Sequence, residues 1–138
     1  MSNAIIRKLL QTHLVAGAPG DVLPTAWEGV AFTPVAGQAY QKPYLLPGRT
    51  RNPTLGDGFK REVGLFQISL GYPDGAGTGG IEAKSAALCA HFARGLVLED
   101  GLVRVRVDES PYASRVDTGN GWLQLAVSVP YEADIFSA

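Results

Sequence analysis

The segment from Gly75 to Gly80 is the strongest candidate for chemistry in this sequence. It matches the G-x-G-x-x-G pattern with which dinucleotide-binding proteins hold a pyrophosphate at a helix N-terminus, and Glu99 lies near the offset expected of a ribose-binding acid. That pattern requires a tight turn from strand to helix, whereas Tyr72-Pro73-Asp74 separates these glycines from the preceding strand. We therefore interpret the segment as a loop that enters a helix, and nucleotide binding is kept only as an alternative function.

Neither the two histidines nor the single cysteine has the spacing of a metal or catalytic site. His13 and His91 each fall on a predicted helix without a second ligand on the same face. Cys89 falls on the apolar side of its helix, where a buried and unreactive thiol is expected. The carboxylates are scattered, and no pair of them is selected as general acid and base. The sequence predicts no catalytic residue, no metal and no cofactor, and the protein is not expected to be an enzyme.

A basic loop from Arg49 to Arg61 has the character of a binding surface. It carries Arg49, Arg51, Lys60 and Arg61 against the single acid Asp57, together with Leu55 and Phe59. Exposed loops carry function more often than cores do. The functional interpretation is an arm that docks on a neighbouring molecule or a polyanion, and the alternative is a solvated hairpin tip.

Two further features lie in the last third of the chain. Arg104 and Arg106 alternate with three valines, so they are expected on the outer face of a strand, either solvated or paired with acids of another subunit. The segment from Pro130 to Phe136 is aromatic and apolar, which indicates a terminus that docks and does not fray.

Hydrophobic periodicity predicts the elements that position these residues. Apolar residues at three- and four-residue intervals predict helices over about 5–14 and 81–93. Alternation and β-branched content predict strands, and glycine and proline predict the loops between them. The predicted strands are Trp27–Thr33, Tyr40–Leu46 (at an edge, because it contains Pro43), Arg61–Gly71, the Val103–Val107 segment and Gly121–Tyr131, and Pro47–Gly58 is predicted to be a long loop.

Composition limits the class of protein. The chain has 138 residues, of which 46% are hydrophobic, and a formal net charge of −1. This length and apolar content favour one domain, spanning 1–138, with a real core. A charge near zero is not typical of a general nucleic-acid or membrane-surface binder. No apolar run is long enough to span a membrane and no secretion signal is recognised, so we expect an intracellular protein.

The order of the elements predicts the architecture. A helix, two or three strands, a second helix and two or three more strands cannot form a sheet covered on both faces. We expect an α+β fold of a single domain, with an antiparallel or mixed sheet and two helices packed on one face.

Several segments together resemble one known family. They are Leu23–Pro34, Asn52–Phe59 followed by Gly64–Ile68, Tyr72-Pro73, Glu82–Leu88 and His91–Leu96. In order and spacing they look like the small tail-terminator proteins of siphovirus-like bacteriophages, and the similarity extends from about Ile5 to Phe136.

The resemblance implies a structural virion protein without cofactor or catalytic residues. Such subunits cap the finished tail tube as a ring, usually a hexamer, which ends polymerisation and presents a surface to the head. The implied partners are other copies of the chain, the tail tube protein and a head-completion protein, with no membrane and no sequence-specific nucleic acid. The implied location is the virion tail, after assembly in the bacterial cytoplasm. A monomer in solution before assembly is compatible with this role.

The resemblance also suggests a role for the basic loop. We expect the interface with a neighbouring subunit or the tube to include Arg49, Arg51, Leu55, Phe59, Lys60, Arg61, Val63 and Leu65. A different neck or tail-completion protein, or an interaction module of similar build, is the alternative.

Overall fold

The computed structural model describes residues 2–16, 23–52, 58–75 and 77–136. In this part of the chain there are two helices and seven strands. Two strands follow the first helix, as predicted, but five follow the second, where two or three were predicted. The elements are α1 (Ser2–Val15), β1 (Tyr40–Arg51), β2 (Phe59–Pro73), α2 (Gly79–His91), β3 (Val97–Asp100), β4 (Val103–Val107), β5 (Tyr112–Ala113), β6 (Asp117–Gly119) and β7 (Trp122–Phe136).

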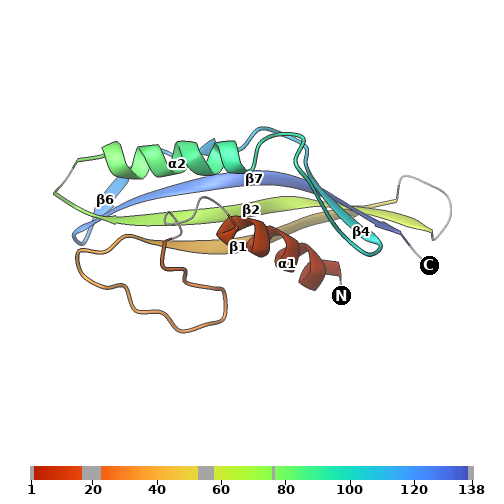
Figure 1. The fold of residues 1–138 in the computed structure, drawn as a ribbon, viewed down its shortest axis with the longest axis horizontal. Coiled ribbons are helices and arrows are strands. Elements are labelled where there is room, and N and C mark those ends of the chain that lie inside the picture. Colours follow the sequence, from red (N-terminus) through yellow and green to blue (C-terminus); the bar gives the residue numbers. More distant parts are fainter. Residues whose placement is uncertain (1, 17–22, 53–57, 76, 137–138) are drawn as a thin grey trace.

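The strands form one antiparallel sheet around the long pair β2 and β7 (Figure 1). These two strands pair along their whole length, from Phe59 opposite Phe136 to Pro73 opposite Trp122. The strand order is β1-β2-β7-β4-β3, and β5 and β6 extend the β4 side by pairing with the first half of β7. The two outer strands of that order, β1 and β3, are therefore the edges of the sheet.

Only one face of the sheet is covered by the helices. Every second residue of the strands points into one buried cluster, because side chains alternate between the faces of a strand. Both helices contribute to this same cluster: α1 lies over β3 and β4, and α2 lies over β7 and β2. The cluster includes Ile6, Leu10 and Leu14 of α1, Ile81, Leu88 and Phe92 at α2, Phe66, Ile68 and Leu70 of β2, and Leu125, Val127 and Val129 of β7. The predicted α+β fold, with two helices on one face of an antiparallel sheet, is confirmed.

Two histidines join the C-terminal ends of the helices. The imidazole rings of His13 and His91 are stacked, with centroids 4.0 Å apart and planes inclined by 7°. Each ring donates a hydrogen bond from Nε2 to the other residue's backbone carbonyl, at 2.9 Å for His13 and 2.5 Å for His91. The edge of Phe92 closes the contact against both rings. These histidines therefore connect the two helices.

We expect the stability of the protein to fall as the pH drops below about 6.5, the ordinary pKa of histidine. Burial lowers the pKa of His13, and the neighbouring His91 lowers it further, against a backbone hydrogen bond that raises it. The unfolded chain thus binds a proton more readily than the folded chain, so the contribution of neutral His13 is present above pH 6.5 and lost below it. Urea unfolding between pH 7.5 and 5 measures this, and His13→Asn, which keeps a donor but does not titrate, should flatten the dependence.

The prediction of a strand over Trp27–Thr33 is wrong. The chain turns there, with Val30 N–H bonded to Trp27 O and Gly29 at a φ of +78°, which an extended strand does not accept. The preceding residues pair with the outer edge of β1 instead, in a single parallel bridge between Thr25 and Gln41. Aromatic and β-branched content indicated a strand, but Gly29 and Pro34 prevent a continuous ladder.

The prediction of a loop over Pro47–Gly58 is wrong in its first part, because β1 continues to Arg51. The strand passes Pro47 through a register shift between Pro47 and Thr50. Gly48 makes this passage possible, because a Cβ there would lie 2.5 Å from the Val63 carbonyl oxygen. Since a β-bulge accommodates one extra residue at a proline, the glycine and proline that indicated a loop are part of a strand.

Candidate functional site

The face of the sheet opposite the helices carries most of the predicted site. The register places residues of β1, β2, β7, β4 and β3 side by side on this open face. From β1 to β3 they include Tyr40, Lys42, Tyr44 and Leu46; Arg61, Val63, Leu65, Gln67 and Ser69; Gln124, Ala126, Ser128, Pro130, Glu132 and Asp134; Arg104 and Arg106; and Val97 and Glu99.

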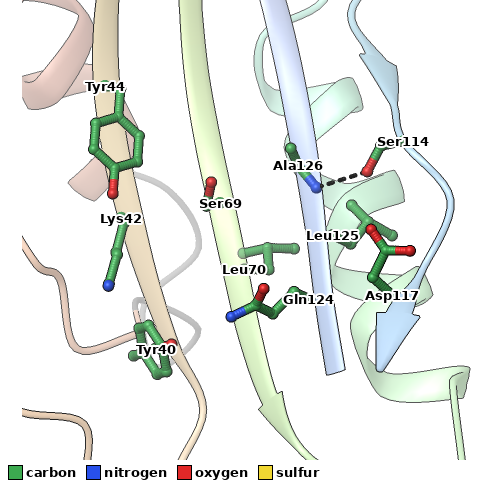
Figure 2. Close-up of a pocket in the computed structure, with 10 residues that line it drawn as sticks. All are labelled: Tyr40, Lys42, Tyr44, Ser69, Leu70, Ser114, Asp117, Gln124, Leu125 and Ala126. Carbon is green, nitrogen blue, oxygen red and sulfur yellow. Dashed lines mark hydrogen bonds between the residues drawn. The ribbon is translucent and has the colours of Figure 1, made fainter. Parts of the chain in front are cut away.

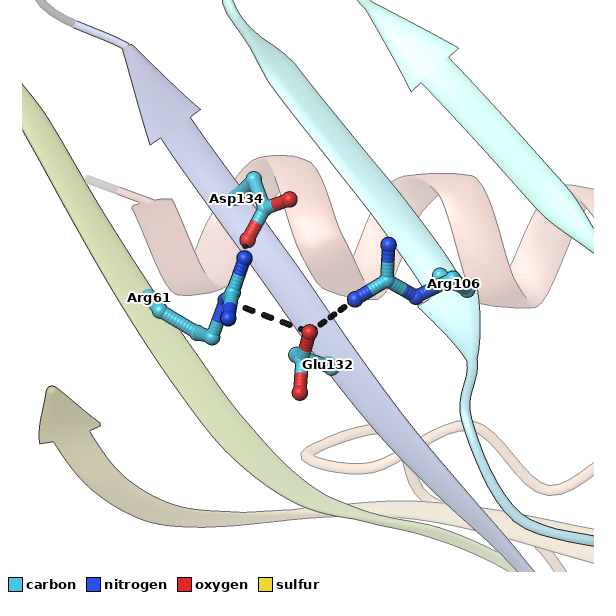
Figure 3. A network of polar contacts seen from close by, with 4 residues as sticks. All are labelled: Arg61, Arg106, Glu132 and Asp134. Carbon is cyan, nitrogen blue, oxygen red and sulfur yellow. Dashed lines mark hydrogen bonds and ion pairs between the residues drawn. The ribbon is translucent and has the colours of Figure 1, made fainter. Parts of the chain in front are cut away.

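Four charged residues form a network on one half of the open face (Figure 3). Arg61 Nε lies 2.8 Å from Asp134 Oδ1 and 3.1 Å from Glu132 Oε1, and Arg106 forms an ion pair with the same oxygen of Glu132. The carboxylates are largely buried, with side chains 11% and 13% exposed, beneath the more exposed arginines. The hydrogen bond to Asp134 raises the pKa of Arg61 above its usual value, although partial burial opposes this. The two charges of each sign neutralise one another, so the network joins β2, β7 and β4.

Arg61 therefore differs from the other basic residues of the predicted site. Arg49, Arg51 and Lys60 are exposed, and within the described residues none of them has an ion pair. Leu55 lies outside the described residues.

The remaining predicted residues belong to β2. Val63 and Leu65 lie half-buried on the open face. Phe59 packs against Phe136, with ring centroids 5.1 Å apart, and the Arg61 guanidinium lies 5.3 Å from the Phe59 ring centre. Phe59, Val63 and Leu65 thus line one side of the charged network, and the exposed Arg51 lies at its β1 border. Lys60 alternates with Arg61 along β2, so its exposed side chain lies on the other face of the sheet.

The other half of the open face contains a shallow hollow of about 290 Å³ (Figure 2). Its floor includes the small residues Ser69 and Ala126, and β1 provides Tyr40, Lys42 and Tyr44 on one side. Ser114 and Asp117 lie on the opposite side, where Ser114 Oγ accepts a hydrogen bond from Ala126 N–H at 3.0 Å. One cation and one anion on opposite walls suit a polar contact surface. The lining shows no nucleophile held against a base.

The glycine segment does not have the structure of a dinucleotide site. β2 ends at Pro73 and α2 begins at Gly79, with exposed Gly75 and Gly77 at φ values of +105° and +82° between them. β2 is antiparallel to both of its neighbours, whereas the dinucleotide motif belongs to a parallel βαβ unit. The interpretation as a loop before a helix agrees with this geometry.

The nucleophile and metal candidates are also accounted for. Burial raises the pKa of the Cys89 thiol, which disfavours the reactive thiolate. Among the described residues, no three His, Cys, Asp or Glu side chains are grouped so as to bind a metal ion.

In the same part of the chain, neither helix has the length and apolar character needed to cross a membrane.

These features define a small α+β protein whose charged side chains pair across a sheet surface. The chain belongs to the phage tail terminator protein family, whose model matches residues 4–131. A solved structure is similar to the chain, with 29% sequence identity, a TM-score of 0.78, and coverage of 100% of this chain and 99% of that chain. No curated protein matches the chain.

Membership confirms the family suggested by the sequence segments and indicates a structural component of phage tails. The network of acids was the part of the site that sequence analysis missed. A signal was present, since Glu132 and Asp134 alternate along the chain with the same period as Arg104 and Arg106. Only the register of β4 against β7 shows that these two alternating sets face each other.

Proposed function

We propose that this protein caps the phage tail tube as a hexameric ring of identical subunits. The ring ends polymerisation of the tube and forms the surface to which the head is joined. Its partners are other copies of the chain, the tail tube protein and a head-completion protein. It acts in the bacterial cytoplasm during assembly and remains in the virion tail.

The observation that carries this proposal is the family match over residues 4–131. A ring of one protein needs a heterologous interface, in which one surface of the subunit complements a different surface of the next copy. Exposed Arg49 and Arg51 of β1, at one border of the sheet, supply one such surface. Interfaces of this kind can be weak until the partner is present, so a monomer in solution is compatible with the function.

Removing the gene from its phage or prophage should leave tails that are longer than normal and carry no head. Without a cap, tube subunits continue to add to the open end, and the joining surface is missing. Electron microscopy of induced lysates measures tail length and head attachment, and expression of the unchanged gene from a plasmid should restore both. Tails of normal length with heads attached, in a lysate without the protein, would contradict the proposal.

A further inference from the structure

Charged residues form a row across the five strands β1, β2, β7, β4 and β3 at one end of the open face. The row follows from the register, which sets each residue directly opposite the next on the neighbouring strand. From β1 to β3 its members are Arg51, Arg61, Asp134, Arg104 and Glu99. The signs alternate from Arg61 to Glu99, and the row begins with a cation at one sheet edge and finishes with an anion at the other.

Within the part of the chain that the structure describes, the cation at the β1 edge has no ion-pair partner. Arg51 lies directly opposite Arg61, and like charges at opposed positions destabilise a sheet. Arg61 is already bound to Asp134 and Glu132, and within the described residues Arg51 has no ion pair. A carboxylate supplied from outside the subunit, on the free side of β1, would give Arg51 a partner of opposite charge.

The anion at the β3 edge has capacity for a second cation. Glu99 Oε1 accepts a hydrogen bond from Arg104 Nε at 2.8 Å, and the Glu99 side chain is 57% exposed. A carboxylate has two oxygens and can accept from more than one arginine. Glu99 lies on the open face of β3, which is the last strand of the order at that side of the sheet.

The first half of the β1 edge is closed to a partner. Gln41 N–H donates to Pro24 O and Gln41 O accepts from Ala26 N–H, at 2.9 and 2.8 Å. Leu45 N–H donates to Glu28 Oε1 at 2.7 Å, and Arg7 pairs with the same carboxylate. Burial disfavours the charged form of Glu28, but these two contacts outweigh it and lower its pKa.

The second half of the β1 edge and the edge of β3 remain unpaired. Among the described residues, no strand pairs with the outer side of 48–51 or of 97–100. These two segments lie at the same level of the sheet and run in the same direction, since four antiparallel pairings, through β2, β7 and β4, lead from β1 to β3. Half-exposed apolar residues are present at both, with Leu46 just before the first segment and Val97 at the start of the second.

We propose that the second half of β1 in one copy binds β3 of the next copy, with Arg51 paired to the neighbouring Glu99. This inference rests on the proposed ring and names the surface by which its subunits associate. The two edges are different surfaces of one molecule, as a heterologous interface requires. The strands would meet in parallel, and the row of charged residues would continue from each subunit into the next. Charge complementarity favours a second copy as the partner. Arg51 at one end of the row needs an anion, and the exposed Glu99 at the other end of the same row is such an anion in the next copy.

Cysteine cross-linking tests the contact directly. In a Cys89→Ala background, Arg51→Cys and Glu99→Cys are made separately, purified, mixed, and oxidised in the presence of isolated tails. The mixture should form a covalent dimer and neither variant alone should do so, because each carries one half of the interface. A chain with both substitutions should give a ladder of covalent oligomers. Glu109→Cys, an exposed acid outside β3, replaces Glu99→Cys as the matched control and should not cross-link with Arg51→Cys.

Charge exchange tests the energetics. Arg51→Glu and Glu99→Arg should each weaken assembly by about tenfold or more, since each brings like charges together across the interface. The double variant should recover most of the loss. Native mass spectrometry measures the assembly, and circular dichroism shows whether each variant is folded.

The possible failures separate the two proposals. Rings that form without the cross-link, and that tolerate both charge reversals, overturn the proposed contact and leave the ring intact. Cross-linking of a single variant with itself also overturns it, because that pattern belongs to an isologous contact. A protein that forms no assembly even on tails, and whose removal leaves tails normal, overturns the ring and the contact together.

Discussion

Replacing Phe66 with alanine should lower the free energy of unfolding by about 3–5 kcal/mol. Phe66 is fully buried near the middle of β2, opposite Leu45 of β1 and Val129 of β7. Its ring lies 5.8 Å from that of Phe92, at the end of α2. Truncation leaves a cavity that the sheet cannot close, because long β2 and β7 fix the backbone on both sides. Urea unfolding monitored by circular dichroism measures the loss.

Leu46→Ala is the matched control. Leu46 is also an aliphatic residue of the β1–β2 pair, but its side chain is 43% exposed on the open face. Exposed substitutions of this kind usually change the stability by no more than about 0.5 kcal/mol. If Phe66→Ala and Leu46→Ala cost the same, the helices do not cover the face on which Phe66 lies.

The contrast between Phe66 and Leu46 shows which part of the fold can be predicted from the sequence. Alternation in β2 separates Phe66, Ile68 and Leu70 from Leu65, Gln67 and Ser69, and the structure buries the first set. The three- and four-residue spacing of Ile6, Leu10 and Leu14 likewise marks the buried side of α1. The hydrophobic periodicity of an element reflects only which of its faces is buried. It therefore predicts the core-facing side of each helix and strand before the strand pairing is known.

The connector before β1 shows where this reasoning fails. Trp27–Thr33 has the composition of a strand, yet the backbone hydrogen bonds to β1 are made just before it, between Pro24 or Ala26 and Gln41. Glu28, an ordinary surface acid in the sequence, caps an edge N–H of β1 at Leu45. Such contacts depend on how a turn places the chain beside an edge, and no local pattern of residues encodes that placement.

The candidate site divides in the same way. Basic residues between Arg49 and Arg61 were visible in the sequence as a group, but the structure separates Arg61, which is held by Asp134, from exposed Arg51. Seventy-three positions separate Arg61 from Asp134 in the chain. A pairing of that kind follows from the register of β2 against β7, which depends on the whole sheet, so composition alone could not distinguish the two arginines.

Gly64→Ala is the second change for which we expect a large effect, a loss of about 2–3 kcal/mol, in the upper part of the range for overpacking. A Cβ at Gly64 would lie 2.6 Å from the Leu46 carbonyl oxygen and 2.6 Å from the Tyr131 hydroxyl. The carbonyl belongs to a paired strand and cannot rotate away. Tyr131 is only 1% exposed, and burial raises its pKa to about 12, so a buried neutral phenol occupies the space beside the glycine.

The expected destabilisation by Gly64→Ala is opposite in sign to the usual effect of replacing glycine with alanine in a strand. Alanine in a strand is otherwise favoured over glycine by about 0.5–1 kcal/mol, because glycine loses more conformational freedom on folding. Gly119→Ala in β6, where a Cβ meets nothing within 4 Å, should therefore be neutral or slightly stabilising under the same urea titration. Adding Tyr131→Phe to Gly64→Ala removes one of the two closest contacts and should return part of the lost stability, which a general weakness of β2 would not allow. Equal stabilities of Gly64→Ala and Gly119→Ala would mean that β1, β2 and β7 do not approach as closely at Gly64 as the register requires.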